Sequence, residues 1–140
     1  MGMNKPHWRV EELKHLADDI AWLDAKDARC AYDLVGLYDS KTHLGLNTST
    51  VNSLERLEFD DDVAAATEWL RLRLSSTQAL VVVFGGNDCF RCSGAFFIEN
   101  WQDIFVPSRD DAMIYSDESP VIVFYCHENE FELGQRIVFD

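Results

Sequence analysis

The sequence predicts an α+β fold in which N-terminal helices pack on one face of a mostly antiparallel sheet of about five strands. Up to about residue 76, apolar residues recur mostly at spacings of three and four, which is typical of amphipathic helices. Beyond that point they come in short runs separated by turn residues, which is typical of strands. Because no helix-length segment separates these runs, we expect neighbouring strands to pair antiparallel.

The chain is expected to form one domain over residues 1–140. Its 140 residues match the usual length of a single domain, and hydrophobic residues make up 47% of them, enough for a sizeable core. The change of pattern divides this domain into a helical part at about 4–76 and a β-rich part at about 77–140.

The clearest predicted helix begins near residue 10. Asn4 is a suitable cap, and Pro6 suits the first turn, where its missing N–H costs nothing. A second segment, 25–38, favours a helix that ends near Gly36, although its run LVGLY is also compatible with a strand. The apolar stripe of the first helix consists of Val10, Leu13, Leu16, Ala17, Ile20 and Leu23.

Two further helices are expected before residue 76. Residues 50–57 are predicted to form a short helix after a loop over 40–49. Three aspartates then precede a helix that begins at Val63, where their charge complements the positive end of the helix dipole. They lack the alternating spacing and central glycine of a calcium loop, so we expect them to serve the helix. These residues are Asp60, Asp61 and Asp62.

The expected strands follow residue 76. The first, 79–84, is an unbroken apolar run that should be buried on both faces. The second, 95–98, pairs with it in a hairpin whose loop holds the residues CFRC, and a single helical turn follows from Asn100. The remaining strands are expected at 112–115, at 121–126 and, after a turn at Gly134, at Phe131 and 136–139.

The chain is strongly acidic, with 25 acidic and 12 basic residues and a formal net charge of −13. A charge of about 2 to 8 suffices for the solubility of a small domain. A field of this sign repels nucleic-acid phosphates and anionic lipid, and it speeds encounter with basic proteins. We therefore expect a basic protein partner, and neither direct nucleic-acid binding nor membrane binding. The absence of a signal sequence or a long apolar run predicts a cytoplasmic protein.

The motif CFRC, from Cys89 to Cys92, is similar to the redox motif of thioredoxin-like proteins, in which CxxC follows a buried strand. Pro120, just before the strand at 121–126, also resembles the proline that precedes a later strand in that family. The resemblance implies a thiol-redox site at Cys89 and Cys92. In that family, however, the second cysteine opens a long helix that lowers the thiol pKa. Here the following residues suggest a strand, and the charge of Asp88 opposes thiolate formation.

Zinc binding is a second interpretation of the cysteines, with Cys89, Cys92, Cys126 and His127 as ligands. Cys126 and His127 are adjacent, so within a strand they point to opposite faces and reach one metal only if the strand ends there. The favoured interpretation is that the cysteines are ordinary buried or loop thiols, with no cofactor. No complete catalytic or nucleotide-binding motif is present, since both G-x-S-x-G and G-x-G-x-x-G are missing, which favours a protein that is not an enzyme.

The stretch 110–132 is the main candidate binding surface, because it holds seven acidic residues and no Lys or Arg. In the predicted meander these acids gather at turns along the two rims of the sheet. We expect Trp101 and Phe131 to be partly exposed beside them, since interfaces combine aromatic residues with complementary charge. The acidic candidates are Asp110, Asp111, Asp117, Glu118, Glu128, Glu130 and Glu132.

These features favour a non-enzymatic acidic binding protein, in particular a bacterial immunity or inhibitor protein that neutralises a basic toxin such as a nuclease. Its carboxylates would stand where the toxin binds phosphates. Two alternatives remain open. One is a small zinc-binding or thiol-redox protein that uses the CxxC at 89–92, and the other is a structural or regulatory subunit of a larger assembly.

Overall fold

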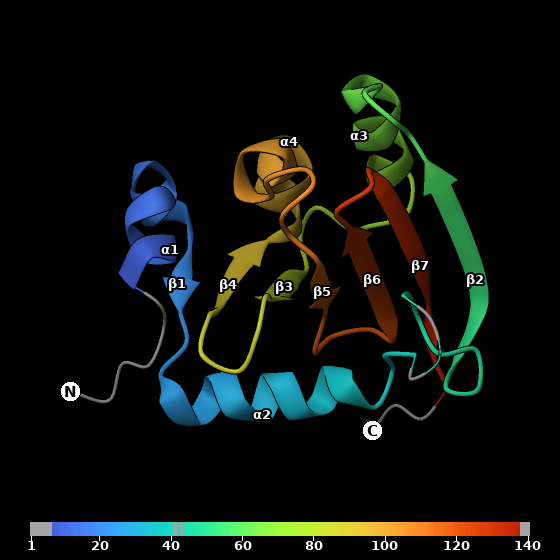
Figure 1. Ribbon diagram of the computed structural model, residues 1–140, viewed down its shortest axis with the longest axis horizontal. Helices are drawn as coiled ribbons and strands as arrows, with labels where there is room; N and C mark the ends of the chain where they lie inside the picture. The colour runs from blue at the N-terminus through green and yellow to red at the C-terminus, as the bar shows by residue number, and fades with distance from the viewer. Residues whose placement is uncertain (1–6, 41, 43, 138–140) are drawn as a thin grey trace.

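The structure, a computed structural model, describes residues 7–40, 42 and 44–137. These residues form an α+β fold with one antiparallel sheet of seven strands in the order β1-β4-β3-β5-β6-β7-β2 (Figure 1). The strands are β1 (Ala21–Trp22), β2 (Val51–Glu58), β3 (Ala79–Val83), β4 (Cys89–Ser93), β5 (Ala112–Tyr115), β6 (Val121–Cys126) and β7 (Glu130–Arg136).

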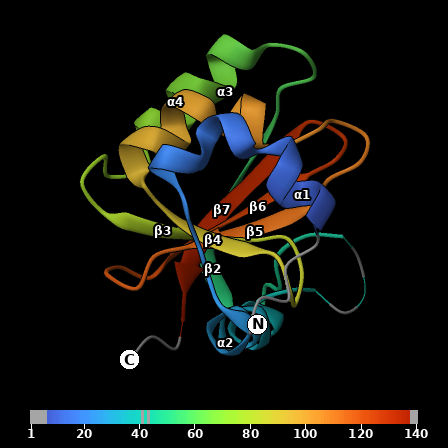
Figure 2. The ribbon, with the colours of Figure 1, turned by 90° about the vertical axis from the view of Figure 1, so that its left-hand side faces the viewer.

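Helices cover both faces of the sheet, which Figure 2 shows as the middle layer. The helix α2 (Ala25–Gly36) runs along one face, and the other helical segments of the described residues lie against the opposite face. The prediction that the helices pack on one face is therefore wrong for α2. The segments opposite α2 are α1 (His7–Glu12), the 3-10 helix η1 (Lys14–Asp19), α3 (Val63–Arg71) and α4 (Gly94–Ile104).

The central strand β3 explains why both faces are covered. Leu80 and Val82 belong to the core beneath α3 and α4, whereas Val81 and Val83 belong to the core against α2. Each of these four residues is at most 3% exposed. A strand that is apolar on both faces needs a layer on each side. The prediction of a strand here that is buried on both faces is confirmed.

Both edge strands come from segments that the apolar pattern assigns to helices. In β2, only Val51 is buried, and the pairing with β7 is interrupted between Asn52 and Glu55, where Ser53 has a φ of 55°. An edge strand with so few buried residues lacks the strict alternation that identifies strands. The helix predicted at 50–57 is therefore wrong, and the sheet has seven strands in place of about five.

The first predicted helix is interrupted. It ends at Glu12, continues as the 3-10 helix η1, and is followed by β1. Leu13 and Leu16 are buried in the core beneath α4, whereas Leu23 packs against the core on the α2 face. The proposed cap and first-turn proline, Asn4 and Pro6, lie outside the described residues.

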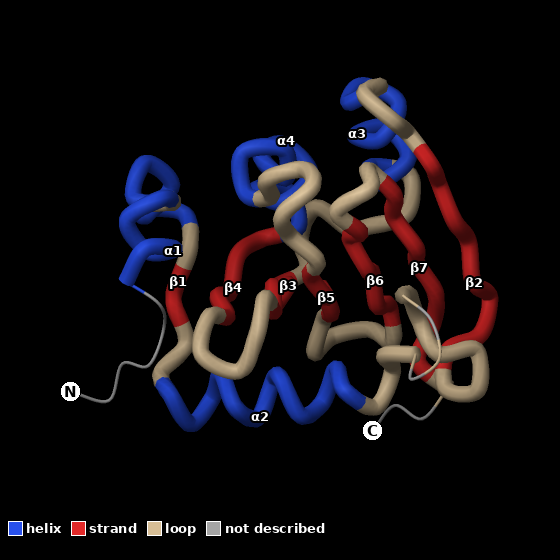
Figure 3. The backbone as a smooth tube through the Cα atoms, viewed as in Figure 1, coloured by secondary structure: helices blue, strands red, loops and turns tan. Residues whose placement is uncertain are grey.

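The helices α2 and α3 agree with the sequence prediction. Asp24 caps α2 by accepting a hydrogen bond from the backbone N–H of Asp27 at 2.8 Å, and Asp62 caps α3 through Ala65 at 3.0 Å. The chain between α2 and β2 is mostly irregular, as expected (Figure 3). None of the helices in the described ranges has the length and apolarity needed to cross a bilayer.

The strand predicted at 95–98 is wrong, because these residues begin α4. Ser93 caps this helix by accepting a hydrogen bond from the backbone N–H of Phe96 at 3.0 Å. Phe97, Trp101 and Ile104 recur at helical spacing and are all buried. The short apolar run AFFI does not by itself distinguish a strand from a buried helix.

The strands β5 and β6 have the predicted bounds. The last strand, β7, is longer than expected and passes through Gly134, which pairs with Ile122 and forms no turn. An added Cβ at Gly134 would overlap Val51 of the neighbouring strand β2, so glycine there permits close approach of the two strands. The final predicted residues, 138–139, lie outside the described residues.

Gly94→Ala should lower the free energy of unfolding by about 1–3 kcal/mol. Its Cβ would overlap the carbonyl oxygen of Ser75, and backbone atoms cannot yield as a flexible side chain does. Urea unfolding measures the change. Gly36→Ala is the matched control, since nothing lies within 4 Å of its added Cβ. Equal effects of the two substitutions would contradict this account of α4 packing.

Candidate functional site

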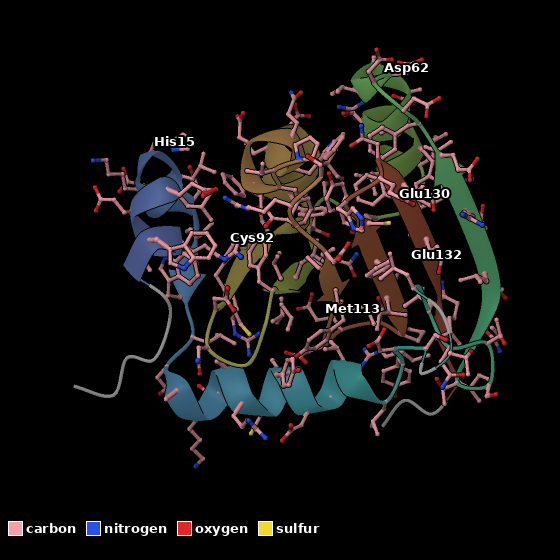
Figure 4. The ribbon with its side chains drawn as sticks, viewed as in Figure 1. His15, Asp62, Cys92, Met113, Glu130 and Glu132 are labelled. Carbon is pink, nitrogen blue, oxygen red and sulfur yellow. The ribbon has the colours of Figure 1, made fainter. Side chains whose placement is uncertain are left out.

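The seven acidic residues of 110–132 do not form one continuous surface. Asp110, Asp111, Glu128 and Glu130 lie at the end of the sheet where β5 and β7 begin and β6 ends. Asp117 and Glu118 lie in the turn between β5 and β6, at the other end. Glu132 lies within β7, and Figure 4 shows it further along the strand than Glu130. Which of these residues can meet a partner is decided by their burial and pairing.

Asp110 is buried, with 3% of its surface exposed. Its carboxylate accepts hydrogen bonds from Arg109 Nε at 2.9 Å and from the backbone N–H of Val106 at 2.8 Å, and Arg9 Nη1 lies 3.5 Å away. Arg9 also donates to Asp88 at 2.7 Å and lies over the ring of Phe84. Asp110 therefore joins α1 to the segment before β5 and exposes almost no surface to a partner.

The two buried carboxylates of this network respond differently to their surroundings. Burial raises the pKa of Asp88, and the hydrogen bond from Arg9 does not offset it. Burial also acts to raise the pKa of Asp110, but hydrogen bonds from Arg109 and from the Val106 backbone, together with the charge of Arg9, bring this pKa below its usual value. Asp110 is therefore ionised and stabilising at neutral pH.

Glu132 is also internal, with 8% of its surface exposed. Its Oε1 accepts a hydrogen bond from the backbone N–H of Leu46 at 2.8 Å. The neighbouring Gly45 has a φ of 139° and leaves no room for a Cβ beside the carboxylate. This contact holds the loop after α2 against the sheet, and it leaves little of Glu132 exposed to a partner.

Three more of the predicted acids are engaged within the molecule. Glu130 pairs with Arg56 at 2.8 Å, and Asp117 pairs with Arg91 at 3.1 Å. Glu118 accepts a hydrogen bond from the backbone N–H of Ala79 at 2.9 Å. Asp117 and Glu118 are exposed, whereas the Glu130 side chain is only 16% exposed, and the two arginines partly neutralise the charge of Asp117 and Glu130.

Trp101 and Phe131 are 3% and 0% exposed, so the expectation that they are partly exposed is wrong. Their rings meet at 5.1 Å within a cluster of aromatic residues beneath α3 and α4. The indole N–H of Trp101 donates to Thr67 of α3 at 3.0 Å. The residues are aromatic because they fill the core between the helices and β7.

Cys89 and Cys92 lie within β4 and not in a hairpin loop. Three residues apart in a strand, they point to opposite faces: Cys89 belongs to the core against α2 and Cys92 to the core beneath α4. Burial raises the pKa of each thiol to about 12. The structure therefore does not bring these cysteines together as ligands of one metal, and it gives neither the low pKa of a redox thiol.

The structure does bring together Cys126, His127 and a third residue, Asp111. Asp111 Oδ1 accepts a hydrogen bond from the backbone N–H of His127 at 2.9 Å. The same oxygen is hydrogen-bonded to His127 Nδ1 at 2.8 Å. This bond raises the pKa of His127, and burial raises the pKa of Cys126. One candidate ligand atom from each of the three residues lies within 4.8 Å of the others. The sequence interpretation includes Asp111 among the acids but does not connect it with Cys126 and His127.

A pocket of about 480 Å³, here named the α2 pocket, lies between α2 and the sheet. Its apolar wall includes Met113, which Figure 4 shows on the α2 side of β5, and its rim includes the exposed residues Tyr32 and Leu44. It is lined by Tyr32, Asp33, Val35, Gly36, Asp39, Leu44, Val83, Asp111, Ala112, Met113 and Phe124. Carboxylates are therefore the only charged side chains among its described lining residues.

A smaller hollow of about 160 Å³, here named the aromatic hollow, lies at the same end of the sheet on the opposite face. Two turns form its sides, and they are joined by a hydrogen bond of 3.0 Å from the Phe59 backbone N–H to the Asn129 carbonyl. Asp60 and Asn129 both have positive φ, 53° and 61°. The hollow is lined by Phe59, Asp60, Asp61, Val63, Trp101, Gln102, Phe105, Pro107, Tyr125 and Asn129.

Asp60 and Asp61 are the functional candidates that the sequence analysis missed. Both are exposed and form no salt bridge among the described residues, and only Asp62 serves as the cap of α3. Glu128, next to the lining residue Asn129, is also exposed. Since one acid is enough to cap a helix, the run of three aspartates was the available signal for exposed acids at this end of the sheet.

A comparison of this chain with known protein families and with curated proteins finds no match. The site is therefore interpreted from its own geometry.

Asp110→Asn should lower the free energy of unfolding at pH 7 by about 3 kcal/mol, because it leaves buried Arg9 without one of its charged partners. The folded pKa lies below the usual 3.8, so this stabilisation is present above that pH and is lost as the pH falls through the folded pKa. The difference from the natural protein should therefore shrink in acid. Urea unfolding at pH 7 and at a pH below 3.8 tests this. The control is Asp18→Asn, a change of an exposed residue that should alter the free energy of unfolding by less than about 0.5 kcal/mol.

Cys30 should be the one cysteine of the four that reacts rapidly with a disulfide reagent in the folded protein. It is exposed, whereas Cys89, Cys92 and Cys126 are buried. Counting thiols with time, before and after addition of denaturant, should show one fast thiol and three that appear on unfolding. Rapid reaction of Cys89 or Cys92 in the folded protein would contradict their placement in the two cores.

Proposed function

We propose that this chain is a non-enzymatic acidic binding protein that inhibits a basic protein partner, such as a toxin nuclease. The observation that carries the proposal is the aromatic hollow, an apolar depression bordered by carboxylates without ion-pair partners among the described residues. The hollow lies beside the β6–β7 turn, so Glu128 is the residue of the predicted acidic surface that remains next to it. Asp60 and Asp61 take the place of most of the other predicted acids.

The distribution of positive charge supports the proposal. The chain has 12 Lys and Arg residues, of which Lys5 and Lys41 lie outside the described ranges. Eight of the other ten form salt bridges at 2.7 to 3.5 Å: Arg9, Lys14, Arg29, Arg56, Arg71, Arg73, Arg91 and Arg109. Arg136 is buried and donates to backbone carbonyls. Lys26 is the remaining one, and it forms no salt bridge among the described residues. Acids in excess of these few accessible cations would attract a basic partner.

The hollow fits a lysine or arginine side chain of that partner. A cavity of about 150 Å³ accommodates a ligand the size of benzene, so a hollow of about 160 Å³ accommodates one long side chain. The apolar stem would lie against Phe105 and Tyr125, and its charged end would reach Asp60 and Asp61. Aromatic faces also attract cations.

Inhibition would follow from occlusion. A basic nuclease binds substrate phosphates with Lys and Arg, and carboxylates held at the mouth of the hollow would compete for the same groups. The long-range field would raise the association rate, and the contacts in the hollow would slow dissociation. Both effects act on binding and require no catalytic residue.

A second candidate function is that of a subunit in a larger assembly. Exposed apolar residues gather near the C-terminal end of α2, where Tyr32, Leu37 and Leu44 are 45%, 62% and 50% exposed. A patch of this kind marks protein interaction sites. Binding through this surface would depend little on salt, whereas binding through the aromatic hollow would weaken as salt increases.

The proposal is tested by recovering partners on the immobilised chain from a native lysate at several salt concentrations. Recovered proteins are identified, purified and assayed for loss of activity when the chain is added. We expect a basic protein that elutes with salt and is inhibited at a one-to-one ratio. If every recovered protein stays bound as the salt concentration rises, the result contradicts the inhibitor proposal and supports the function as an assembly subunit.

Asp60→Asn combined with Asp61→Asn should lower the association rate with that partner several-fold and flatten its salt dependence. Asp18→Asn with Asp19→Asn is the matched control, because it changes the net charge equally but lies in η1, at the other end of the row of helices from α3 (Figure 1). Stopped-flow or surface binding measures both. If the two double variants lower the association rate equally, the attraction depends on net charge alone and not on the acids beside the hollow.

A further inference from the structure

We propose that Asp111, Cys126 and His127 form a binding site for a divalent transition-metal ion of the zinc class. The three side chains place one oxygen, one sulfur and one nitrogen within 4.8 Å of one another. This set includes two of the ligands considered in the sequence but replaces Cys89 and Cys92 by Asp111. The inference is independent of the aromatic hollow and of the proposed function.

The register of the sheet accounts for the convergence. Ala112 of β5 pairs with Tyr125 of β6, so the next position of the same ladder sets Asp111 opposite Cys126. Residues opposite each other on antiparallel strands carry side chains on the same face. Asp111 and Cys126 are therefore brought side by side by strand pairing, although 15 positions separate them in the chain.

His127 joins them because β6 ends at Cys126. Within a strand, adjacent residues point to opposite faces, but His127 begins the turn to β7 and is released from that alternation. The turn is held by a hydrogen bond of 3.0 Å from Asn129 N–H to the Cys126 carbonyl. This satisfies the condition under which the two neighbouring residues can bind one metal ion.

The chemistry of the ligands selects the metal. Thiolate and imidazole favour zinc and similar ions over magnesium and calcium, which prefer oxygen alone. Zinc binds sulfur at about 2.3 Å and nitrogen or oxygen at about 2.0–2.2 Å. Binding therefore requires the His127–Asp111 hydrogen bond, 2.8 Å long, to open so that both atoms face the ion.

The site opens to water on one side. The side chains of His127 and Asp111 are 36% and 39% exposed, whereas Cys126 is buried. A metal with these three ligands would complete a tetrahedral shell with a water molecule, the arrangement found where zinc keeps an exchangeable position. Asp111 also lines the α2 pocket, so the ion would lie beside that pocket's wall.

The test is titration of the metal-free, reduced full chain with Co²⁺ and then with Zn²⁺. We expect one equivalent of Co²⁺ to produce the near-ultraviolet band of a cobalt–thiolate bond, and one equivalent of Zn²⁺ to remove it. His127→Gln and Asp111→Asn change residues that are at least partly exposed, and they should weaken Zn²⁺ binding at least about 100-fold, the largest effect usual for residues that only support a metal ligand. Cys126→Ser should abolish the thiolate band.

Matched controls separate this site from the other thiols and imidazoles. Cys30→Ser removes the exposed cysteine, and His15→Gln removes an exposed histidine of η1, which Figure 4 shows far from β6. Both should bind Zn²⁺ as the natural chain does. Loss of the band in Cys30→Ser, no thiolate band at one equivalent, or unchanged affinity in folded His127→Gln and Asp111→Asn would each overturn the proposal. Circular dichroism establishes that each variant is folded.

Discussion

The rest of the structure depends on the burial of both faces of the central strands. The segment 79–83 is apolar at every position from Leu80 to Val83, and these residues alternate between two separate cores. Such a strand is stable only if apolar layers cover it on both sides. This requirement is met by α2 on one face and by α3 and α4 on the other (Figure 2).

The layered arrangement also determines which charged side chains form ion pairs within the molecule. Arginines of α1, β2, β4 and the loop before β5 lie close to acids of neighbouring segments, and most described arginines form ion pairs within the chain. Among the described residues, the acids that form no salt bridge include Asp60, Asp61 and Glu128, which lie in turns at one end of the sheet. The net charge is therefore a property of the whole molecule, whereas the hollow concentrates accessible acids beside apolar surface.

One end of the sheet carries all the candidate sites. The turn between β6 and β7 contributes Asn129 to the aromatic hollow and His127 to the trio with Asp111, and Asp111 also lines the α2 pocket. The aromatic hollow shares no side chain with the other two features, whereas Asp111 belongs to both the trio and the α2 pocket. Substitutions in the hollow can therefore be tested without changing the lining of the α2 pocket or the trio.

The sequence by itself determined the α+β class, the helices α2 and α3, whose apolar residues recur at helical spacing, and the strands β3, β5 and β6, which are short apolar runs bounded by turn residues. Tertiary structure decided the rest. The run 95–98 is too short to show its period, and β2 lies at an edge where few residues are buried. Trp101 and Phe131 are buried only because α3, α4 and β7 meet around them. Likewise, Asp111 meets Cys126 through strand register, and Asp60 meets Tyr125 across a hollow, since contacts between distant segments depend on pairing that no local pattern encodes.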